Sequence, residues 1–319
     1  MNGKIALWLL VISLTLLLVF NSFTISALPS PKPLYPKDKS KIRLMVPSDT
    51  GRGRGKGSKG RLPSPDLSKP NKWAVIIGIA DYEGKANDLW HPDEDAKEMY
   101  YVLINFYGFA RDHIILLTNK KATAEAILNA IDWLITWENS TSIVVFFYSG
   151  HGYNASEDVT SQYEYPIDET DGIDECIVSY DLYAIPDDLL KEKLSQIESN
   201  NVFLWFGSCF SGGMNDIFHT LATLSRTIVL TSACQETQLT YDVLQLGNTL
   251  FGYYYVDEGI IDGKADGYGP NGVLDEIITV EEAFYYADEH VNAFVQLYNL
   301  EPSDPEIFDS VPDVDFYLG

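Results

Sequence analysis

The chain has 319 residues, of which 46% are hydrophobic and 13% aromatic, a composition typical of a globular protein with a substantial core. The length suits one large α/β domain or two small ones. The net charge of −24 is unevenly spread: residues 28–72 hold 12 Lys and Arg against three acids, whereas the chain from Trp73 onward holds nine Lys and Arg against 43 Asp and Glu. Residues 28–72 are therefore basic, whereas the chain from Trp73 onward is strongly acidic.

Residues 1–27 are predicted to direct export. Lys4 precedes 16 uncharged and mostly apolar residues, and small residues follow as far as Ala27, which is the pattern of a cleaved secretory signal. No charge occurs from Ile5 to Pro31, so an uncleaved membrane anchor is also long enough. Both alternatives predict a secreted or cell-surface protein, and it touches the membrane through this segment only if the segment is uncleaved.

Residues 28–72 are predicted to form a disordered linker. The segment is rich in Pro, Gly, Ser and positive charge and has almost no periodic apolar positions. Its run "GRGRGKGSKGR" has the charge to bind nucleic acid. In an exported protein, however, a solvated linker or a protease-accessible activation segment is the better interpretation, and we expect no nucleic-acid partner.

From residue 73 to residue 319 the pattern alternates between strands and helices. Continuous apolar runs predict strands covered on both faces, and apolar residues at helical spacing predict helices between them. This alternation is typical of an α/β domain with a mostly parallel sheet and helices on both faces. The strands are expected at 72–82, 112–119, 142–150, 201–208 and 226–233, and the helices at 91–109, 123–138 and 186–198. Residues 304–310 are a candidate edge strand.

Two of these strands end in glycine-rich turns that hold a histidine and a cysteine. His151 and Cys209 follow the third and fourth strands, and reactive groups collect at the carboxyl ends of such strands. A thiol attacks a carbonyl as the thiolate, and histidine can take its proton and later return one to the leaving amine. The amides of Gly152 and Cys209 are candidate oxyanion donors. His91 and His219 are alternative bases.

The stretches "FFYSGHG" and "GSCFSGG" resemble the caspase-like clan of cysteine peptidases, which includes caspases, metacaspases, legumain and gingipains. "LWHPDEDAKEMYYVL", "DGIDECIVSYD" and "VLTSAC" are similar to their counterparts in metacaspase-type members. The resemblance implies a caspase-like αβα sandwich over residues 73–319. It also implies His151 and Cys209 as the catalytic pair and Gly152 and Cys209 as the oxyanion donors.

The resemblance is less complete at the positions that set specificity. Metacaspase-like members cut after Arg or Lys and have an Asp two residues before the catalytic Cys, where this chain has Gly207. Their other pocket acid corresponds to Asp95, and the match in "VLTSAC" assigns Ser232 to substrate binding. Cleavage after aspartate would need pocket arginines, and the domain has only Arg111 and Arg226. A basic residue before the scissile bond is therefore expected. Charge compensation at a helix N-terminus is the alternative for Asp95.

The remaining thiols, Cys176 and Cys234, leave two possibilities open. An exported protein with two cysteines besides its nucleophile could form one disulfide. Two free buried thiols are the favoured alternative.

Residues 256–282 form an acidic insert rich in Asp, Gly and Asn. Its spacing does not match the twelve-residue EF-hand loop, and Thr279 with Glu282 forms a capping box that explains part of the pattern without a metal. The alternative is a Ca²⁺ site, because the oxygen atoms of these side chains are the ligands that Ca²⁺ prefers. The candidate ligands are Asp262, Asp266, Asn271, Asp275 and Glu282.

The function predicted from these features is an exported cysteine endopeptidase that acts on peptides or proteins through an acyl-enzyme. Its own basic linker is an expected substrate, with self-cleavage between Arg52 and Lys72. A catalytically silent surface-binding protein with the same fold is the alternative from another class. Hydrolysis of another amide or ester by the same pair is a third possibility.

Overall fold

The computed structural model describes residues 29–45, 62, 64–155, 172–222 and 226–319. The predicted signal or anchor, the run "GRGRGKGSKGR" and most of the acidic loop that follows residue 155 lie outside these ranges. Residues 32–319 form one compact unit, to which the description below applies. Within the described ranges, no helix combines the length and apolar character that crossing a membrane requires.

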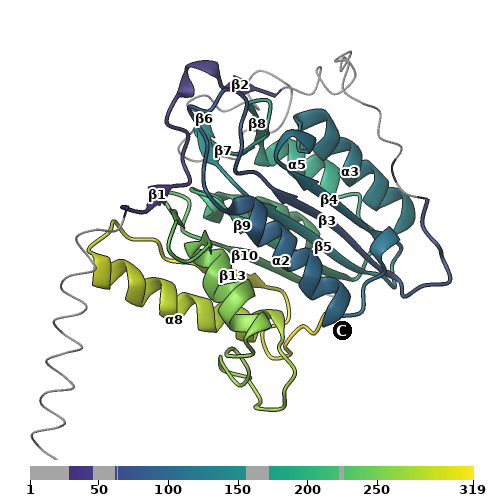
Figure 1. Ribbon diagram of the computed structural model, residues 1–319. Coiled ribbons are helices and arrows are strands. Elements are labelled where there is room, and N and C mark those ends of the chain that lie inside the picture. The colour runs from purple at the N-terminus through teal and green to yellow at the C-terminus, as the bar shows by residue number, and fades with distance from the viewer. Residues whose placement is uncertain (1–28, 46–61, 63, 156–171, 223–225) are drawn as a thin grey trace, which may run out of the picture. The chain divides into compact units, whose positions relative to one another are not determined.

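The centre of this unit is a six-stranded sheet with the strand order β13-β10-β9-β5-β3-β4 (Figure 1). Five strands are parallel, and β13 pairs antiparallel with β10 at one edge. The predicted mostly parallel sheet and its last edge strand are thus confirmed. The strands are β3 (Lys72–Gly78), β4 (Ile114–Thr118), β5 (Ile143–Ser149), β9 (Asn201–Gly207), β10 (Thr227–Ser232) and β13 (Glu306–Asp309).

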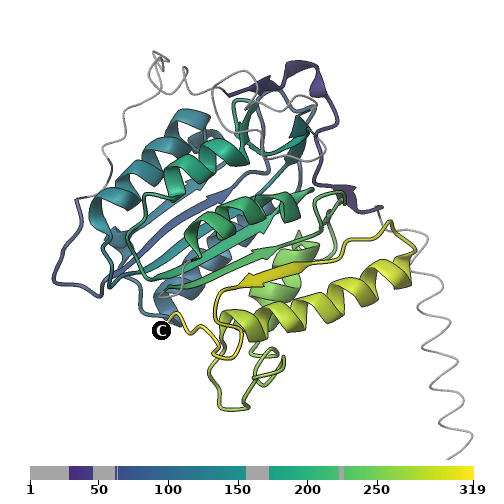
Figure 2. The same ribbon diagram turned by 180° about the vertical axis from the view of Figure 1, so that it is seen from behind.

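The continuous apolar runs form strands because both faces of the sheet are covered. In β3, Val75 and Ile77 belong to one hydrophobic cluster, and Ala74 and Ile76 belong to the other. Helices α3, α5 and α6 supply side chains to the first cluster, and α2, α7 and α8 supply the second (Figures 1 and 2). The helices are α2 (Pro92–Asn105), α3 (Ala124–Trp137), α5 (Asp187–Leu194), α6 (Asn215–Leu221), α7 (Leu250–Gly252) and α8 (Val280–Tyr298).

Local signals fix several helix ends. The side chain of Thr123 accepts a hydrogen bond from the Ala126 amide at the start of α3. The predicted capping box of Thr279 and Glu282 is present at the start of α8. A π-helix, η7 (Tyr253–Ile261), follows α7 and includes the first residues of the acidic insert, and the sequence did not predict it. Short 3₁₀ turns occur at Lys39–Lys41, Arg111–His113, Asn119–Lys121 and Ser211–Met214.

Two smaller sheets lie beside the central one. The first has the order β2-β8-β7-β6, and the second has the order β1-β11-β12. Figure 1 shows β1 at the end of the molecule where the carboxyl ends of β5 and β9 lie. Their strands are β1 (Lys32–Pro33), β2 (Arg43–Leu44), β6 (Gly152–Ala155), β7 (Asp174–Val178), β8 (Tyr183–Pro186), β11 (Tyr241–Val243) and β12 (Asn248–Thr249).

The structure corrects the predicted linker over its first part. Residues 32–45 are built into the unit, since β1 pairs with β11 and β2 pairs with β8. Leu34 and Met45 are 0% and 5% exposed, so they anchor the segment. Two strands of two residues each are too short to produce a period in the sequence, which is why the composition alone suggested a tether.

Candidate active site

The turns after β5 and β9 bring His151 and Cys209 to one edge of the sheet. The two strands are neighbours, with Ser149 opposite Gly207 in the last register pair. Gly152 packs directly on the cysteine turn, because a Cβ atom placed on it would lie 1.9 Å from the Cys209 carbonyl oxygen. Only glycine permits this approach. The predicted meeting of the two turns is therefore present in the structure.

Hydrogen bonds hold the imidazole of His151 in one orientation. Its Nε2 lies 2.7 Å from the Asn87 carbonyl oxygen, which can only accept, so Nε2 bears the proton. The His151 amide donates to the Tyr82 hydroxyl at 2.8 Å, and the Tyr148 hydroxyl donates to the His151 carbonyl at 2.7 Å. Nδ1 is buried and has no hydrogen-bond partner among the described residues. It is the nitrogen left to act as a base.

The thiol of Cys209 lies at a sharp turn. Phe210, the next residue, has a φ of 62° in the left-handed region, which turns the chain into the 3₁₀ helix that follows. The Thr240 amide donates to the Cys209 sulfur at 3.3 Å. Burial, and then the neighbouring Cys234 thiol, raises the pKa of Cys209 well above its usual value. Burial lowers the pKa of His151 to about 4. Both groups are therefore neutral in this arrangement.

The predicted oxyanion donor Gly152 has a partner within the chain. Its amide donates to the carbonyl oxygen of Leu34 at 2.9 Å. The nitrogen of Cys209 lies 3.0 Å from the place where a Cβ of Gly152 would be, so the second predicted donor is adjacent. The carbonyl of Leu34 thus occupies the Gly152 amide, which was predicted to bind the carbonyl oxygen of a substrate.

Asp95, the predicted pocket acid, is fully buried and accepts four hydrogen bonds. One oxygen accepts from the Asn248 side chain and the Thr249 amide, and the other accepts from the hydroxyls of Ser149 and Thr249. Burial raises the pKa of Asp95 to about 6 in spite of these donors. The carboxylate joins the start of α2 to the end of β5 and to β12, which precedes α7. The hydroxyl of Ser232, the other predicted substrate contact, donates to the Cys234 carbonyl at 3.2 Å.

Gly207 occupies the position at which metacaspase-like members have their second acid, and an aromatic ring fills the adjacent space. A Cβ on Gly207 would lie 2.3 Å from the indole of Trp205. That indole stacks between Phe147 and Phe251, at centroid distances of 4.0 and 5.2 Å. A carboxylate at this position would displace a buried aromatic stack.

The other candidate groups have separate surroundings. Within the described ranges Cys176, Cys209 and Cys234 are all free and buried, so the favoured alternative of free thiols is the one observed. His91 is the N-cap residue of α2, and His219 lies in α6 with its ring 6.3 Å from that of Phe308. By contrast, His151 is followed directly by Gly152, which packs on Cys209.

The predicted calcium ligands do not converge. Among the described residues, no group of three or more His, Cys, Asp or Glu side chains is placed to hold a metal ion. Backbone amides, an ion pair and the tail of the chain already engage these side chains. Asp266 accepts from the amides at 275 and 276, Glu282 accepts from those at 267, 273 and 279, Asp275 accepts from that at 277, Asp262 pairs with Lys264, and Asn271 donates to Asp315.

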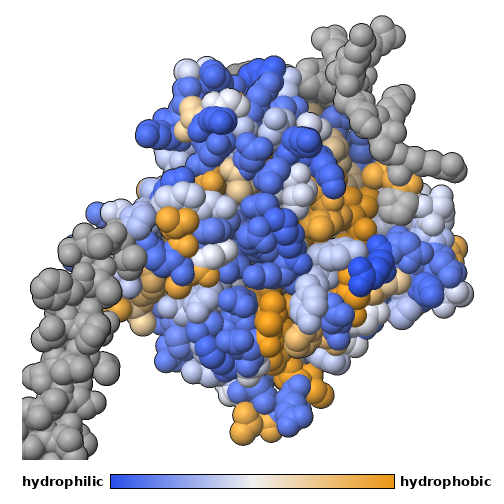
Figure 3. Space-filling model, viewed as in Figure 1, coloured by the Kyte–Doolittle hydropathy of each residue, from blue (hydrophilic) through white to orange (hydrophobic). Residues whose placement is uncertain are grey.

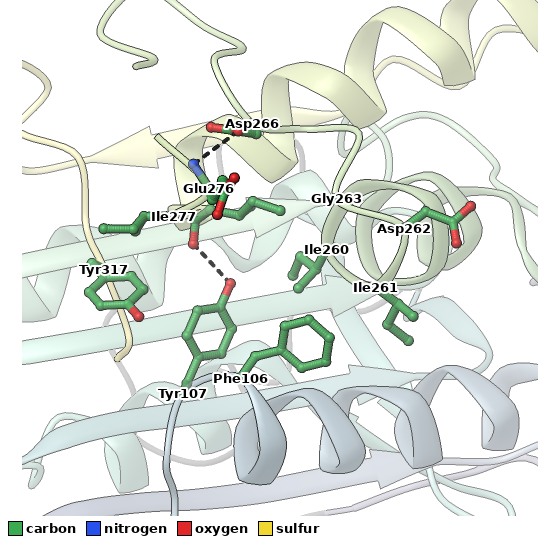
Figure 4. A pocket seen from close by; sticks show the side chains of 11 residues that line it. Phe106, Tyr107, Ile260, Ile261, Asp262, Gly263, Asp266, Glu276, Ile277 and Tyr317 are labelled. Carbon is green, nitrogen blue, oxygen red and sulfur yellow. Dashed lines mark hydrogen bonds between the residues drawn. The ribbon is translucent and has the colours of Figure 1, made fainter. Parts of the chain in front are cut away.

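A pocket of about 250 Å³ lies away from the candidate catalytic edge (Figure 4). It is lined by Phe106, Ile260 and Tyr317, and the hydroxyl of Tyr107 donates to the Ile278 carbonyl at 2.9 Å beside it. Phe106 is the C-cap residue of α2, whereas Asp95 lies in the first turn of that helix. The pocket is thus at the amino ends of the strands, opposite to His151 and Cys209.

Sequence reasoning missed the main-chain groups that complete the site. The Asn87 carbonyl orients the histidine, the Thr240 amide contacts the thiol, and the Leu34 carbonyl lies on the oxyanion donor. Backbone groups are the same in every residue, so no residue type indicates them. Glycines beside His151 and Cys209 were the only sequence signal for this close backbone packing.

A parallel α/β sheet with a histidine and a cysteine at the ends of adjacent strands, between glycine-rich turns, defines the class of this protein. The chain belongs to the caspase domain family, whose model matches residues 71–253. It is 32% identical over 151 residues to metacaspase-7 of Arabidopsis thaliana, covering 46% of this chain and 36% of that protein. It is 34% identical over 163 residues to metacaspase-1 of Lodderomyces elongisporus, covering 48% and 35%.

The chain thus spans about a third of the length of these relatives. Among solved structures, it is similar to protein GSU0716 from Geobacter sulfurreducens, with a TM-score of 0.53 and 20% identity over 76% of this chain and 94% of that one. This last likeness concerns the fold.

Proposed function

We propose that this protein is a cysteine endopeptidase in which Cys209 is the nucleophile and His151 is the general acid and base. The observation that supports this most directly is the buried Nδ1 of His151, which has no hydrogen-bond partner among the described residues. Its other nitrogen is fixed by the Asn87 carbonyl, and the next residue packs on the cysteine turn. A base held in this way is oriented for proton transfer.

In the proposed reaction, Nδ1 of His151 takes the thiol proton as the sulfur of Cys209 attacks the scissile carbonyl. The negative charge that develops on the carbonyl oxygen is stabilised by the amides of Gly152 and Cys209. The C–N bond then breaks, and the imidazolium gives its proton to the leaving amine. Water, deprotonated by His151, attacks the thioester and releases the carboxylic acid and the free thiol.

The test is hydrolysis of a denatured protein by the wild-type chain and by Cys209→Ala. We expect the substitution to reduce the rate by about 10³-fold or more, because it removes the proposed nucleophile. Cys176→Ala is the matched control, a buried thiol in β7 that should be dispensable. Equal rates for Cys209→Ala and wild type would refute the proposed nucleophile.

A silent surface-binding protein remains the alternative, and thiol chemistry separates it from a peptidase. Iodoacetamide should label Cys209 before Cys176 and Cys234, because a nucleophile must be reached by its substrate. Equal labelling of the three cysteines, together with no hydrolysis of any peptide, would favour the silent protein. Hydrolysis of esters or non-peptide amides alone would point to the third possibility.

Specificity and processing are separate proposals. Self-cleavage between Arg52 and Lys72 fits a tethered basic segment near a domain of opposite charge, because tethering raises the local concentration of the segment. Residues 52–61 lie outside the described ranges. Sequencing the N-termini of wild type and Cys209→Ala tests it: an intact wild type, or the same cut in both proteins, would exclude self-processing there. The preference for a basic residue depends on Asp95, whose oxygens already accept four hydrogen bonds.

Export and calcium binding are also proposals. The apolar N-terminus supports export, and N-terminal sequencing of the secreted product would locate the cut near Ala27 or show that the segment is retained. The acidic insert supports calcium by composition alone, and an ion would have to compete with the backbone amides that its carboxylates bind. A calcium titration of the melting temperature decides this, since a ligand bound only by the folded state raises it.

A further inference from the structure

Strand β1 lies beside the catalytic turn in the way an extended peptide substrate would. It pairs antiparallel with β11, and beyond it the Leu34 amide donates to the Thr240 carbonyl at 2.9 Å. The Leu34 carbonyl accepts from the Gly152 amide, also at 2.9 Å. Adding a strand to a free sheet edge is a common mode of peptide binding. Because the Leu34 carbonyl lies on the proposed oxyanion donor, the peptide bond between Leu34 and Tyr35 takes the place of the scissile bond in this register.

Lys32, two residues before Leu34, has a cation-binding environment. Its Nζ lies 4.0 Å from the centroid of the Trp90 ring and donates to the Asp88 carbonyl at 3.3 Å. Asp242, opposite it in the strand register, is fully buried, and the Trp90 amide donates to it. An aromatic face, a carbonyl and a nearby acid together favour a cation at this position.

Tyr35, on the other side of the same peptide bond, lies among aromatic rings. Its ring stacks on Tyr153 of β6 at 6.2 Å and meets the edge of Phe210, the residue after the nucleophile, at 5.3 Å. Lys39 of the same segment covers it at 4.0 Å. These contacts select an aromatic side chain after the bond.

The side chain before the bond is apolar. Leu34 is 0% exposed and belongs to the hydrophobic cluster that includes Cys209. Neither position expected to supply an acid for a basic residue is suited to it. Position 207 is a glycine that lies against Trp205, and the oxygens of Asp95 already accept four hydrogen bonds. The arrangement therefore favours an aliphatic residue directly before the scissile bond.

We propose that the cleft binds extended peptides with a cation at the third position before the scissile bond, an aliphatic residue directly before it and an aromatic residue after it, and that residues 32–35 occupy this cleft as an internal competitor. The proposal rests on the proposed function. It moves the recognition of a basic residue from the position before the bond to the position that Lys32 occupies.

A pair of hydrogen bonds from the Asn87 side chain, called the clamp below, holds the segment in place and supports this role. The Asn87 side chain forms two hydrogen bonds with Asp38, accepting from its amide at 2.7 Å and donating to its carbonyl at 3.0 Å. The main chain of the same residue orients His151. With the cleft filled, burial holds the pKa of the Cys209 thiol high and that of His151 low. Displacing the segment would hydrate both groups and so favour the reactive thiolate.

The first test measures alkylation of Cys209 in the full chain by mass spectrometry. Lys32→Glu should weaken the segment, and Asn87→Ala should release its clamp while keeping the main-chain carbonyl that orients the histidine. Each should accelerate alkylation by about tenfold or more, since the open fraction of molecules sets the rate. Lys37→Glu, an exposed charge reversal in the same segment, is the matched control and should match the wild type. Unchanged rates in both variants would overturn the internal competitor.

The second test identifies the substrate class with the Lys32→Glu chain. The peptide Ser-Pro-Lys-Pro-Leu-Tyr-Pro-Lys repeats residues 30–37, and two analogues have Arg or Asp in place of its Leu. We expect hydrolysis between Leu and Tyr, with the Leu peptide preferred over both analogues by about tenfold or more. Replacing the first Lys of the peptide by Glu should slow it by a similar factor, because the cation site is then unfilled.

The outcomes separate this inference from the proposed function. Rapid hydrolysis with a preference for the Arg peptide would overturn the substrate class and leave the peptidase intact. Faster alkylation of the variants without hydrolysis of any peptide would overturn the peptidase and leave the occupied cleft supported. N-terminal sequencing adds a third measurement: self-cleavage in the register seen here begins a new chain at Tyr35, whereas a basic preference begins it after an Arg or Lys of residues 52–72.

Discussion

At the scale of single residues, the catalytic edge depends on a glycine that no other residue can replace. A Cβ on Gly152 would lie 1.9 Å from the Cys209 carbonyl oxygen, so Gly152→Ala must push the two turns apart. We expect peptidase activity to fall by about 10²-fold or more, because an oxyanion donor is displaced. Gly247→Ala is the control: φ is +80° there and no atom lies within 4 Å, so it should lose stability with little loss of activity. Parallel losses of activity in both variants would indicate general destabilisation.

Tyr82 is a second residue whose role can be measured. Its hydroxyl accepts from the His151 amide at 2.8 Å, and its ring lies 4.7 Å from the imidazole. Tyr82→Phe leaves that buried amide without its acceptor, which should cost about 1–3 kcal/mol of unfolding free energy in urea. Because the histidine is held less firmly, kcat should fall while KM changes little. A variant with wild-type kcat would show that Tyr82 serves stability alone.

At the scale of elements, β9 shows how one strand excludes the usual pocket acid. Gly207→Asp would place a Cβ atom 2.3 Å from the Trp205 ring, which stacks with Phe147 and Phe251, and would add a carboxylate beside it. We expect a loss of about 3 kcal/mol or more in urea unfolding, from overpacking and a buried charge without a partner. The double variant with Trp205→Leu should recover part of this loss, and Trp205→Leu alone is the control. No recovery would mean that the buried charge, and not the crowding, dominates.

The sequence predicted the long elements and the turns that hold the two candidate catalytic side chains. The apolar runs of β3, β5 and β9 cannot be solvated, so their strands could be predicted, and with them the meeting of the two turns that follow β5 and β9. Strands β1 and β2 have only two residues each, too few to show an alternating hydrophobic pattern. Their positions depend on the burial of Leu34 against residues far along the chain. The π-helix Tyr253–Ile261 has no sequence signal of its own, and the groups that Asn87 and Thr240 contribute are main-chain atoms.

At the scale of the whole molecule, some acidic side chains of the domain lie on the surface and others lie in the interior. Figure 3 shows hydrophilic atoms over most of one face and an apolar group at the lowest point. In the insert, Val273 and Leu274 are 61% and 82% exposed. Other acids are buried or half-buried: desolvation raises the pKa of the buried Asp242 and of the half-buried Glu98 to about 7. The fold therefore keeps several carboxyl groups in places that disfavour their ionised form.

The pH dependence of stability follows from these buried acids, and Glu281 in α8 provides the clearest test. It is 3% exposed, one oxygen accepts from the Phe316 amide at 2.7 Å, and burial raises its pKa to about 8. Below about pH 4.5 the group is protonated in both the folded and the unfolded chain, so its ionisation costs nothing. As the pH rises towards 8 the unfolded chain ionises first, and the folded state loses stability. Glu281→Gln cannot ionise, so its melting temperature relative to wild type should rise steadily from about pH 5 to about pH 9. Glu289→Gln, an exposed change in the same helix, should show no such trend, and a constant difference for Glu281→Gln would show that this carboxyl does not titrate with folding.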